Sequence, residues 1–243
     1  MILHPAGILH LSRIPNRRRP TVRHNNESES ENMSFTILCT GQPEKCAQGN
    51  YSSAGFDAAV RAELESGILP YSGRQYNPEG KQIWIGEGIP AQDTAKKLLL
   101  PCTPVVEPLL NEIPLRSFTD TEKLYPVETW KRKAAAQRKH ADPRQSESRQ
   151  DVIDRAERFI EKIAGTEAII ITYPLFLEEL LDRLRIHGYV VQRSGVLKIQ
   201  PLERFLVSRR EEHCGGCQHN CFLSNPGCGV GRDKAIRLKG KES

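Results

Sequence analysis

The order of apolar and polar positions predicts alternating strands and helices from residue 34 to about residue 195. Three apolar runs of strand length are bounded by glycine, proline or polar residues, and they lie at residues 35–39, 83–86 and 168–172. Helices are predicted where apolar residues recur three and four positions apart, or where a basic stretch has helical composition: 51–66, 91–100, 130–140, 148–164 and 175–187. Gly188 is well placed to end the last helix.

Strands that alternate with helices of this length predict a largely parallel sheet covered by helices on both faces. We therefore expect an α/β protein of three layers. In such sheets, ligands bind beyond the carboxyl ends of the strands. Cys39 and Thr40 follow one predicted strand, and Thr172 and Tyr173 follow another. These side chains are expected at the same edge of the sheet.

The chain of 243 residues is long enough for one main domain with a further segment at each end. Residues 1–33 lack the apolar block of a secretory signal, so we expect either a disordered tail or a wrongly assigned start, with Met33 as the true first residue. The main domain is predicted at residues 34–205. Residues 206–243 are predicted to form a cysteine-rich module with a basic tail.

Charge and hydropathy limit the functions that the protein can have. The chain has 35 basic and 30 acidic residues and a net charge of +5, a balance that does not predict a nucleic-acid partner. The longest apolar run, Ala168–Ile171, is far shorter than the roughly 20 residues that span a bilayer, so we expect no membrane insertion and a cytoplasmic location. The basic stretch at residues 130–140 could bind a phosphate or an acidic partner. A charge run is more often a solvated helix face, and we assign no site to it.

Four of the seven cysteines lie within fifteen residues, with glycine, asparagine and proline between them: Cys214, Cys217, Cys221 and Cys228. This spacing lets a short loop place four thiolates around one metal ion. The predicted metal ion is Zn²⁺, and an iron-sulfur cluster is the alternative. Disulfides or unligated thiols are a third possibility. A zinc site closed by four cysteines has no open position for substrate, so its predicted role is structural or in docking. His213 and His219 lie beside the cluster and are expected not to be ligands.

Three stretches give residues 34 to about 195 a resemblance to the histidine phosphatase superfamily, which has the phosphoglycerate-mutase-like fold. GIPAQDTAKKL, residues 88–98, resembles the family's Arg-Ala-x-Gln-Thr-Ala helix. VVEPLLNEIPLRSF, residues 105–118, resembles its Leu-x-Glu segment. Residues 146–184 are similar to its Glu-Ser helix, the following strand and the catalytic turn, and this is the most specific of the three matches.

The resemblance implies a phosphoryl-transfer site. Family members place an Arg-His-Gly motif at a strand end, and its histidine accepts the phosphoryl group covalently because imidazole is nucleophilic near neutral pH. Two arginines and a second histidine bind the phosphate oxygens, and a glutamate protonates the leaving oxygen.

This sequence departs from the family pattern at most of those positions. In ILCTGQ, Cys39 stands at the position of the arginine and Thr40 at that of the nucleophilic histidine. Pro90 stands at the second arginine and Tyr173 at the second histidine, whereas Glu112 retains the acid. The nucleophile and most of the anion-binding groups are therefore missing. The sequence predicts a non-catalytic member with a regulatory or binding role.

Other functions stay open at this point. The protein could be an active phosphomonoesterase or mutase with misaligned residues, for which His140 and His187 are the nearest histidines in sequence. Cys39 could itself be a nucleophile, with Lys45 at the place of the arginine in a cysteine phosphatase loop. An iron-sulfur redox or sensor protein is the third alternative. A protein partner of unknown identity fits the regulatory role, and a small phosphorylated ligand is a weaker expectation.

Overall fold

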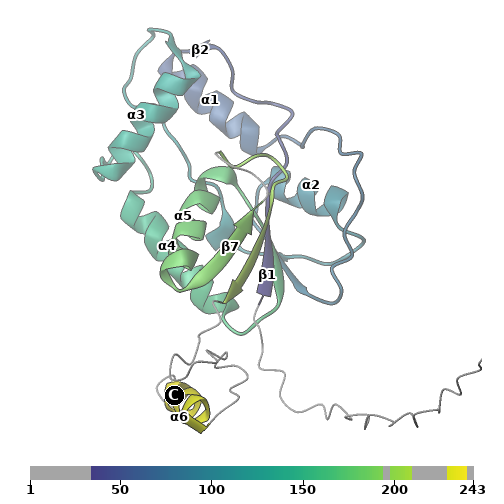
Figure 1. Ribbon diagram of the computed structural model, residues 1–243. Helices are drawn as coiled ribbons and strands as arrows, with labels where there is room; N and C mark the ends of the chain where they lie inside the picture. The colour runs from purple at the N-terminus through teal and green to yellow at the C-terminus, as the bar shows by residue number, and fades with distance from the viewer. Residues whose placement is uncertain (1–33, 194–197, 210–228, 240–243) are drawn as a thin grey trace, which may run out of the picture. The chain divides into compact units, whose positions relative to one another are not determined.

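The computed structural model describes residues 34–193, 198–209 and 229–239 (Figure 1). Its main sheet has six strands in the order β4-β3-β6-β1-β8-β7. The strands are β1 (Ser34–Cys39), β3 (Gln82–Ile85), β4 (Val105–Val106), β6 (Ala168–Thr172), β7 (Tyr189–Arg193) and β8 (Arg204–Arg209). From β4 to β1 neighbouring strands are parallel, and β8 and β7 continue the sheet in antiparallel pairing. The mostly parallel sheet is thus confirmed.

Helices cover both faces of this sheet. They are α1 (Ser53–Leu64), α2 (Ile89–Leu98), α3 (Val127–Lys139), α4 (Arg149–Ile163) and α5 (Pro174–Ile186), with a 3₁₀ turn η1 (Pro108–Leu110). A small two-stranded sheet joins β2 (Asn50–Tyr51) and β5 (Tyr125–Pro126). Helix α6 (Gly229–Lys239) lies near the C-terminus.

The core consists of two apolar clusters, one on each face of the sheet. Ile37 and Ile170 point into the larger cluster, which includes buried residues of α4 and α5. Leu38 and Ile171 point into the smaller one, which includes the buried residues of α2. The alternation follows from the two-residue period of a strand. Helices on both faces of a mostly parallel sheet give the three-layer α/β architecture that the sequence predicts.

Local signals fix the ends of the two best-predicted helices. Ser148 caps α4 through a reciprocal pair of hydrogen bonds with Asp151, which satisfies N–H groups that the helix itself cannot. Helix α5 ends at Ile186, and Gly188 follows with a φ of 81°, a conformation that glycine adopts without steric cost. Both helices therefore lie where the apolar spacing predicts them.

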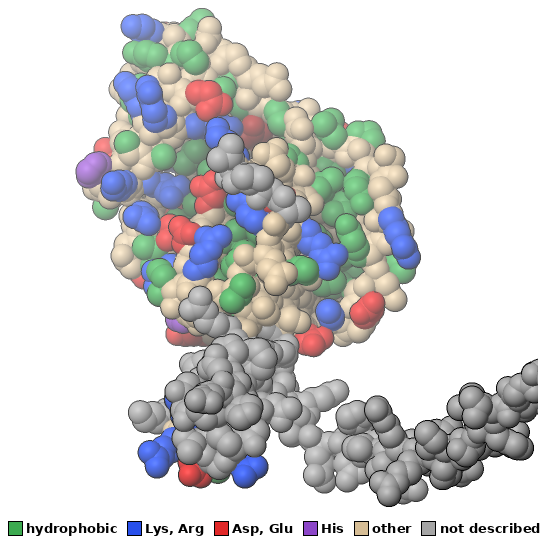
Figure 2. Space-filling view, viewed as in Figure 1, with side chains coloured by type: hydrophobic (Ala, Val, Ile, Leu, Met, Phe, Trp, Pro, Cys, Tyr) green, Lys and Arg blue, Asp and Glu red, His purple; other side chains and the backbone are tan. Residues whose placement is uncertain are grey.

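Several strands were not predicted from the sequence, and β7 and β8 are the longest of them. β7 and β8 pair in antiparallel fashion at one side of the sheet, and residues 204–208 of β8 pair with β1. The predicted domain boundary between residues 205 and 206 falls inside β8. The basic stretch is helical, as predicted, and belongs to α3; Figure 2 shows lysine and arginine side chains at the upper left, where α3 lies.

Candidate functional site at the carboxyl ends of β1 and β6

The five positions singled out in the sequence line one pocket. Cys39, Thr40, Pro90, Glu112 and Tyr173 all contribute to a cavity of about 380 Å³, which we call the sheet-end pocket. The parallel pairing of β1 with β6 brings the two strand ends together, and the Thr40 N–H donates to the carbonyl of Thr172 at 2.9 Å. The prediction that these strand ends share one edge is confirmed.

Most of the remaining wall is apolar. Its aliphatic side chains come from α1, the loop after η1, the start of α5 and the segment before β8: Val60, Leu64, Ile113, Leu115, Leu175 and Ile199. Three prolines besides Pro90 also line it. A phosphate group carries two negative charges and needs several donors, so this wall is poorly suited to hold one.

Glu112 is the acid of the pocket. Its carboxylate accepts three backbone hydrogen bonds, from the N–H of Ile113 at 2.8 Å, of Phe176 at 3.1 Å and of Leu175 at 3.3 Å. The last two belong to the first turn of α5, so Glu112 caps that helix from a distant loop. The residue is half-buried and lines the cavity, with many protein atoms around its carboxyl. This burial raises the pKa of Glu112 to about 7, although the three N–H groups and Arg155 pull it down.

Tyr173 closes the pocket on the side of α2. The residue is 3% exposed, and its hydroxyl faces the backbone N–H groups of Gly88 and Ala91 at the start of that helix. The contact requires glycine, because a Cβ atom on Gly88 would lie 2.3 Å from the hydroxyl oxygen. The hydroxyl has no hydrogen-bond partner of normal geometry in the described residues. Burial raises the pKa of Tyr173, so it stays a neutral phenol.

The structure does not support Cys39 as a nucleophile. Burial raises the pKa of its thiol, and the charges of Glu112 and Glu203 raise it further, so the reactive thiolate does not form near neutral pH. Lys45 is exposed and is not part of the pocket wall. Thr40 is buried beside Cys39, and no histidine among the described residues lines the pocket to act as its base.

Two charged residues that the sequence did not single out lie at the pocket. Lys131 of α3 is 3.8 Å from the carboxylate of Glu63 on α1, and both line the cavity. Glu63 also accepts a hydrogen bond from the N–H of Ala47 at 2.7 Å. Lys131 belongs to the basic stretch to which the sequence assigned no site. No local signal links the two residues, because their pairing depends on the packing of α3 beside α1.

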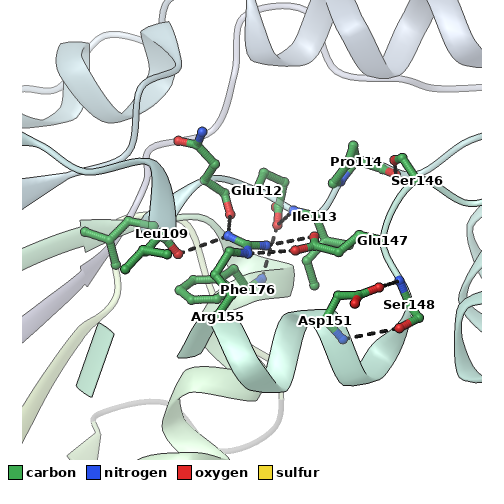
Figure 3. Close-up of polar contacts among 12 residues, drawn as sticks. Leu109, Glu112, Ile113, Pro114, Ser146, Glu147, Ser148, Asp151, Arg155 and Phe176 are labelled. Atoms are coloured by element: carbon green, nitrogen blue, oxygen red, sulfur yellow. Dashed lines mark hydrogen bonds and ion pairs between the residues drawn. The ribbon is translucent and has the colours of Figure 1, made fainter. Parts of the chain in front are cut away.

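Arg155 of α4 fixes the loop that carries Glu112 (Figure 3). Its guanidinium binds both carboxylate oxygens of Glu147, at 2.8 and 2.9 Å, and donates to the carbonyls of Leu109 and Asn111. It also lies over the ring of Phe176, 4.2 Å from the centroid. A sequence signal does exist for Arg155, because it interrupts the apolar stripe that faces the core from α4.

A second cavity, of about 660 Å³, meets the sheet-end pocket at Glu112 and Tyr173. We call it the loop cavity, because it lies beside the segment from η1 to Pro114. Its wall includes the charged residues Glu147, Asp151 and Arg155. Glu112 therefore faces two cavities, and the wall of the second includes three more charged residues.

The two histidines weighed as alternatives lie away from the pocket. His140 is exposed directly after α3, and His187 caps the end of α5 and contacts Glu157. Neither lines the sheet-end pocket or the loop cavity. Within the described part of the chain, no arginine or histidine lines the sheet-end pocket.

The predicted metal ligands Cys214, Cys217, Cys221 and Cys228 lie outside the described residues. Within residues 34–193, 198–209 and 229–239, no group of three or more histidine, cysteine or acidic side chains is arranged to hold a metal ion. The same residues contain no helix of the length and apolarity needed to cross a bilayer.

Comparisons with known proteins give remote similarities of structure. A candidate alpha-ribazole-5'-P phosphatase from Escherichia coli K-12 is 18% identical with a TM-score of 0.38, over 63% of this chain and 79% of that one. The product of open reading frame Rv3214 of Mycobacterium tuberculosis is 17% identical with a TM-score of 0.38, over 63% and 80%. Mycobacterial hydrolase 2 is 14% identical with a TM-score of 0.43, over 85% and 97%.

No family model matches the sequence, and no curated protein matches it. The names of the similar structures describe those proteins alone. Similarities of this degree say nothing about the chemistry of the pocket in this chain.

Proposed function

We propose that this protein is a non-catalytic member of the histidine phosphatase superfamily whose sheet-end pocket binds a small ligand in a regulatory role. The family assignment rests on the three stretches of sequence resemblance. The role rests on the pocket, which the fold preserves while the side chains at its key positions are Cys39, Thr40, Pro90 and Tyr173.

One observation carries the proposal: side chains of the protein itself already lie at the N-termini of the two helices that start at this pocket. The Glu112 carboxylate accepts from the first turn of α5, and the Tyr173 hydroxyl faces the first turn of α2. Helix N-termini are the usual anion-binding elements of such sites. A phosphate bound here would lie beside the Glu112 carboxylate at the N-terminus of α5, and Tyr173 would block its access to the N-terminus of α2.

The absence of a nucleophile supports the same proposal. A threonine hydroxyl needs a neighbouring base, and the described wall around Thr40 has no histidine. The thiol of Cys39 is held in its neutral form by burial. Neither group is equipped to accept a phosphoryl group.

A second candidate function is phosphomonoester hydrolysis, and Glu112 is the observation that favours it. A carboxyl with a pKa of about 7 can donate a proton to a leaving oxygen near neutral pH.

For the C-terminal cysteines, we propose a structural Zn²⁺ site, with an iron-sulfur cluster as the alternative. Either would be held by Cys214, Cys217, Cys221 and Cys228.

Hydrolysis of p-nitrophenyl phosphate distinguishes the two functions. We expect no turnover above the uncatalysed background from the wild-type protein, from Thr40→Ala or from Glu112→Gln. Glu161→Gln is a matched control, because Glu161 lies on the exposed face of α4 away from the pocket. Turnover by the wild type that persists in Glu161→Gln and disappears in Thr40→Ala or Glu112→Gln would establish the enzyme and refute the proposal.

A further inference from the structure

We infer that the ligand of the sheet-end pocket is a small organic cation, an ammonium group on an apolar body, with Glu112 as its counter-ion. This inference rests on the proposed function, because it names the class of ligand for the same pocket. It is the opposite in charge to the phosphorylated ligand that the sequence resemblance implies.

The first argument is the free acceptor capacity of Glu112. A carboxylate offers about four lone-pair positions. In Glu112, Oε1 accepts two backbone hydrogen bonds, at 2.8 and 3.1 Å, whereas Oε2 accepts only one, at 3.3 Å. Oε2 therefore has room for a further N–H donor. The residue lies where the two cavities meet, so a ligand can reach it.

The second argument is the charge left over after the ion pairs are formed. Lys131 lies at the carboxylate of Glu63, and Arg155 is bound bidentately by Glu147. Among the described residues, the two cations that line these cavities are thus already paired with carboxylates. The carboxylates of the two walls that remain without a lysine or arginine partner are Glu112 and Asp151. A cationic ligand complements the negative charge of these two carboxylates, and an anionic ligand does not.

The third argument is the apolar wall. Beyond Glu112 the sheet-end pocket presents aliphatic side chains of α1 and α5, among them Val60, Leu64 and Leu175. Its volume of about 380 Å³ is in the range of pockets that enclose small molecules, roughly 300–1,000 Å³. Burial of an apolar body against this wall adds affinity that an inorganic cation would lack.

The groups that face Glu112 set the pH dependence of binding. Arg155 from α4 and Arg138 from α3 act on it electrostatically, but neither forms an ion pair with it. Cys39 from β1 and Tyr173 before α5 stay neutral. The pKa of Glu112, about 7, means that the carboxyl becomes a counter-ion as the pH rises through neutrality.

The experiment compares probes that share one apolar body. Hexylammonium, hexanol and hexanoate are titrated into the full chain by isothermal calorimetry at about pH 8, where Glu112 is ionised. We expect hexylammonium to bind about tenfold more tightly than hexanol, the gain typical of one charge-assisted hydrogen bond. At about pH 5.5 this preference should fall to less than threefold, because the carboxyl is then protonated. Hexanoate should bind most weakly at pH 8.

Variants separate this inference from the proposed function. Glu112→Gln should bind hexylammonium and hexanol alike, whereas Glu161→Gln, the exposed control, should keep the wild-type preference. Thermal melting checks that both variants are folded. Equal binding of the alcohol and the amine by the wild type, stronger binding of hexanoate, or no binding of any probe would overturn the inference. The hydrolysis assay decides the proposed function separately, so a pocket that prefers the alcohol would leave that function standing.

Discussion

Arg155 is the residue whose loss should disturb the structure around the pocket most. It is 8% exposed, and its guanidinium makes hydrogen bonds to Glu147 and to the carbonyls of Leu109 and Asn111. The replacement Arg155→Met keeps most of the side-chain volume but removes all of these donors. It leaves a carboxylate and two carbonyl groups without their partners beneath the loop that carries Glu112.

The magnitude follows from these contacts. Removal of one partner from a buried ion pair costs about 3–5 kcal/mol, because the other charge stays behind uncompensated. The whole protein is expected to be stable by only about 5–15 kcal/mol, so the change is large. We expect Arg155→Met to lower the free energy of unfolding by about 3–5 kcal/mol, measured by urea denaturation at neutral pH. The double replacement Arg155→Met with Glu147→Leu should recover part of this loss, because it removes the orphaned charge as well.

Arg158→Met is the matched control, since Arg158 is exposed on the same helix. It should change stability by less than about 0.5 kcal/mol. The reasoning would be refuted if Arg155→Met lost no more than this control, since the bidentate pair and the two carbonyl contacts would then contribute nothing measurable.

Two further predictions concern Glu112 and the cysteine cluster. Because the folded-state pKa of Glu112 is raised from 4.5 to about 7, the folded protein binds a proton more tightly than the unfolded chain does, so this group's contribution to stability falls as pH rises across that interval. Relative to Glu112→Gln, the wild type should lose about 3 kcal/mol of stability between about pH 4.5 and pH 7, measured by urea denaturation at several pH values; a flat difference would contradict the raised pKa. Cys217→Ser should lose the bound metal that elemental analysis of the wild type is expected to find, at about one zinc per chain. Retention of full metal stoichiometry by this variant would sink the assignment of Cys217 as a ligand.

The parts of the fold that were predictable are those with strong local signals. β6 lies at residues 168–172, as predicted, because a fully buried parallel strand is a continuous apolar run. Helix α4 carries its own capping box at Ser148 and Asp151. By contrast, only two of the six residues of β8, Phe205 and Val207, are buried, which gives a weak strand signal. Its place in the sheet comes from pairing with β1, far away in the sequence.

Some residues of the candidate site were also predictable from local signals, and others were not. Cys39, Thr40 and Tyr173 were predictable from physics alone, because parallel strands end at one edge of the sheet. Pro90 and Glu112 were found through resemblance to a family and not through any local pattern. Their convergence on one pocket is a finding of the structure.

What the sequence could not provide was the pairing of charges around the pocket. Lys131 with Glu63, and Arg155 with Glu147 and the loop carbonyls, depend on how α1, α3 and α4 pack. The capping of α5 by Glu112 is likewise a contact between residues more than sixty positions apart. These contacts decide the charge of the pocket, and therefore the kind of ligand that we propose.

The most direct test of the central claim is the affinity of the pocket for phosphate itself. Phosphorus NMR line broadening of inorganic phosphate in the presence of the full chain measures it at neutral pH. The account predicts no saturable binding up to about 10 mM, because a dissociation constant below that would require about 3 kcal/mol of favourable contacts that the pocket does not offer an anion. Saturable binding in the micromolar range that Thr40→Ala weakens would show that the pocket still holds phosphate, and would contradict the account.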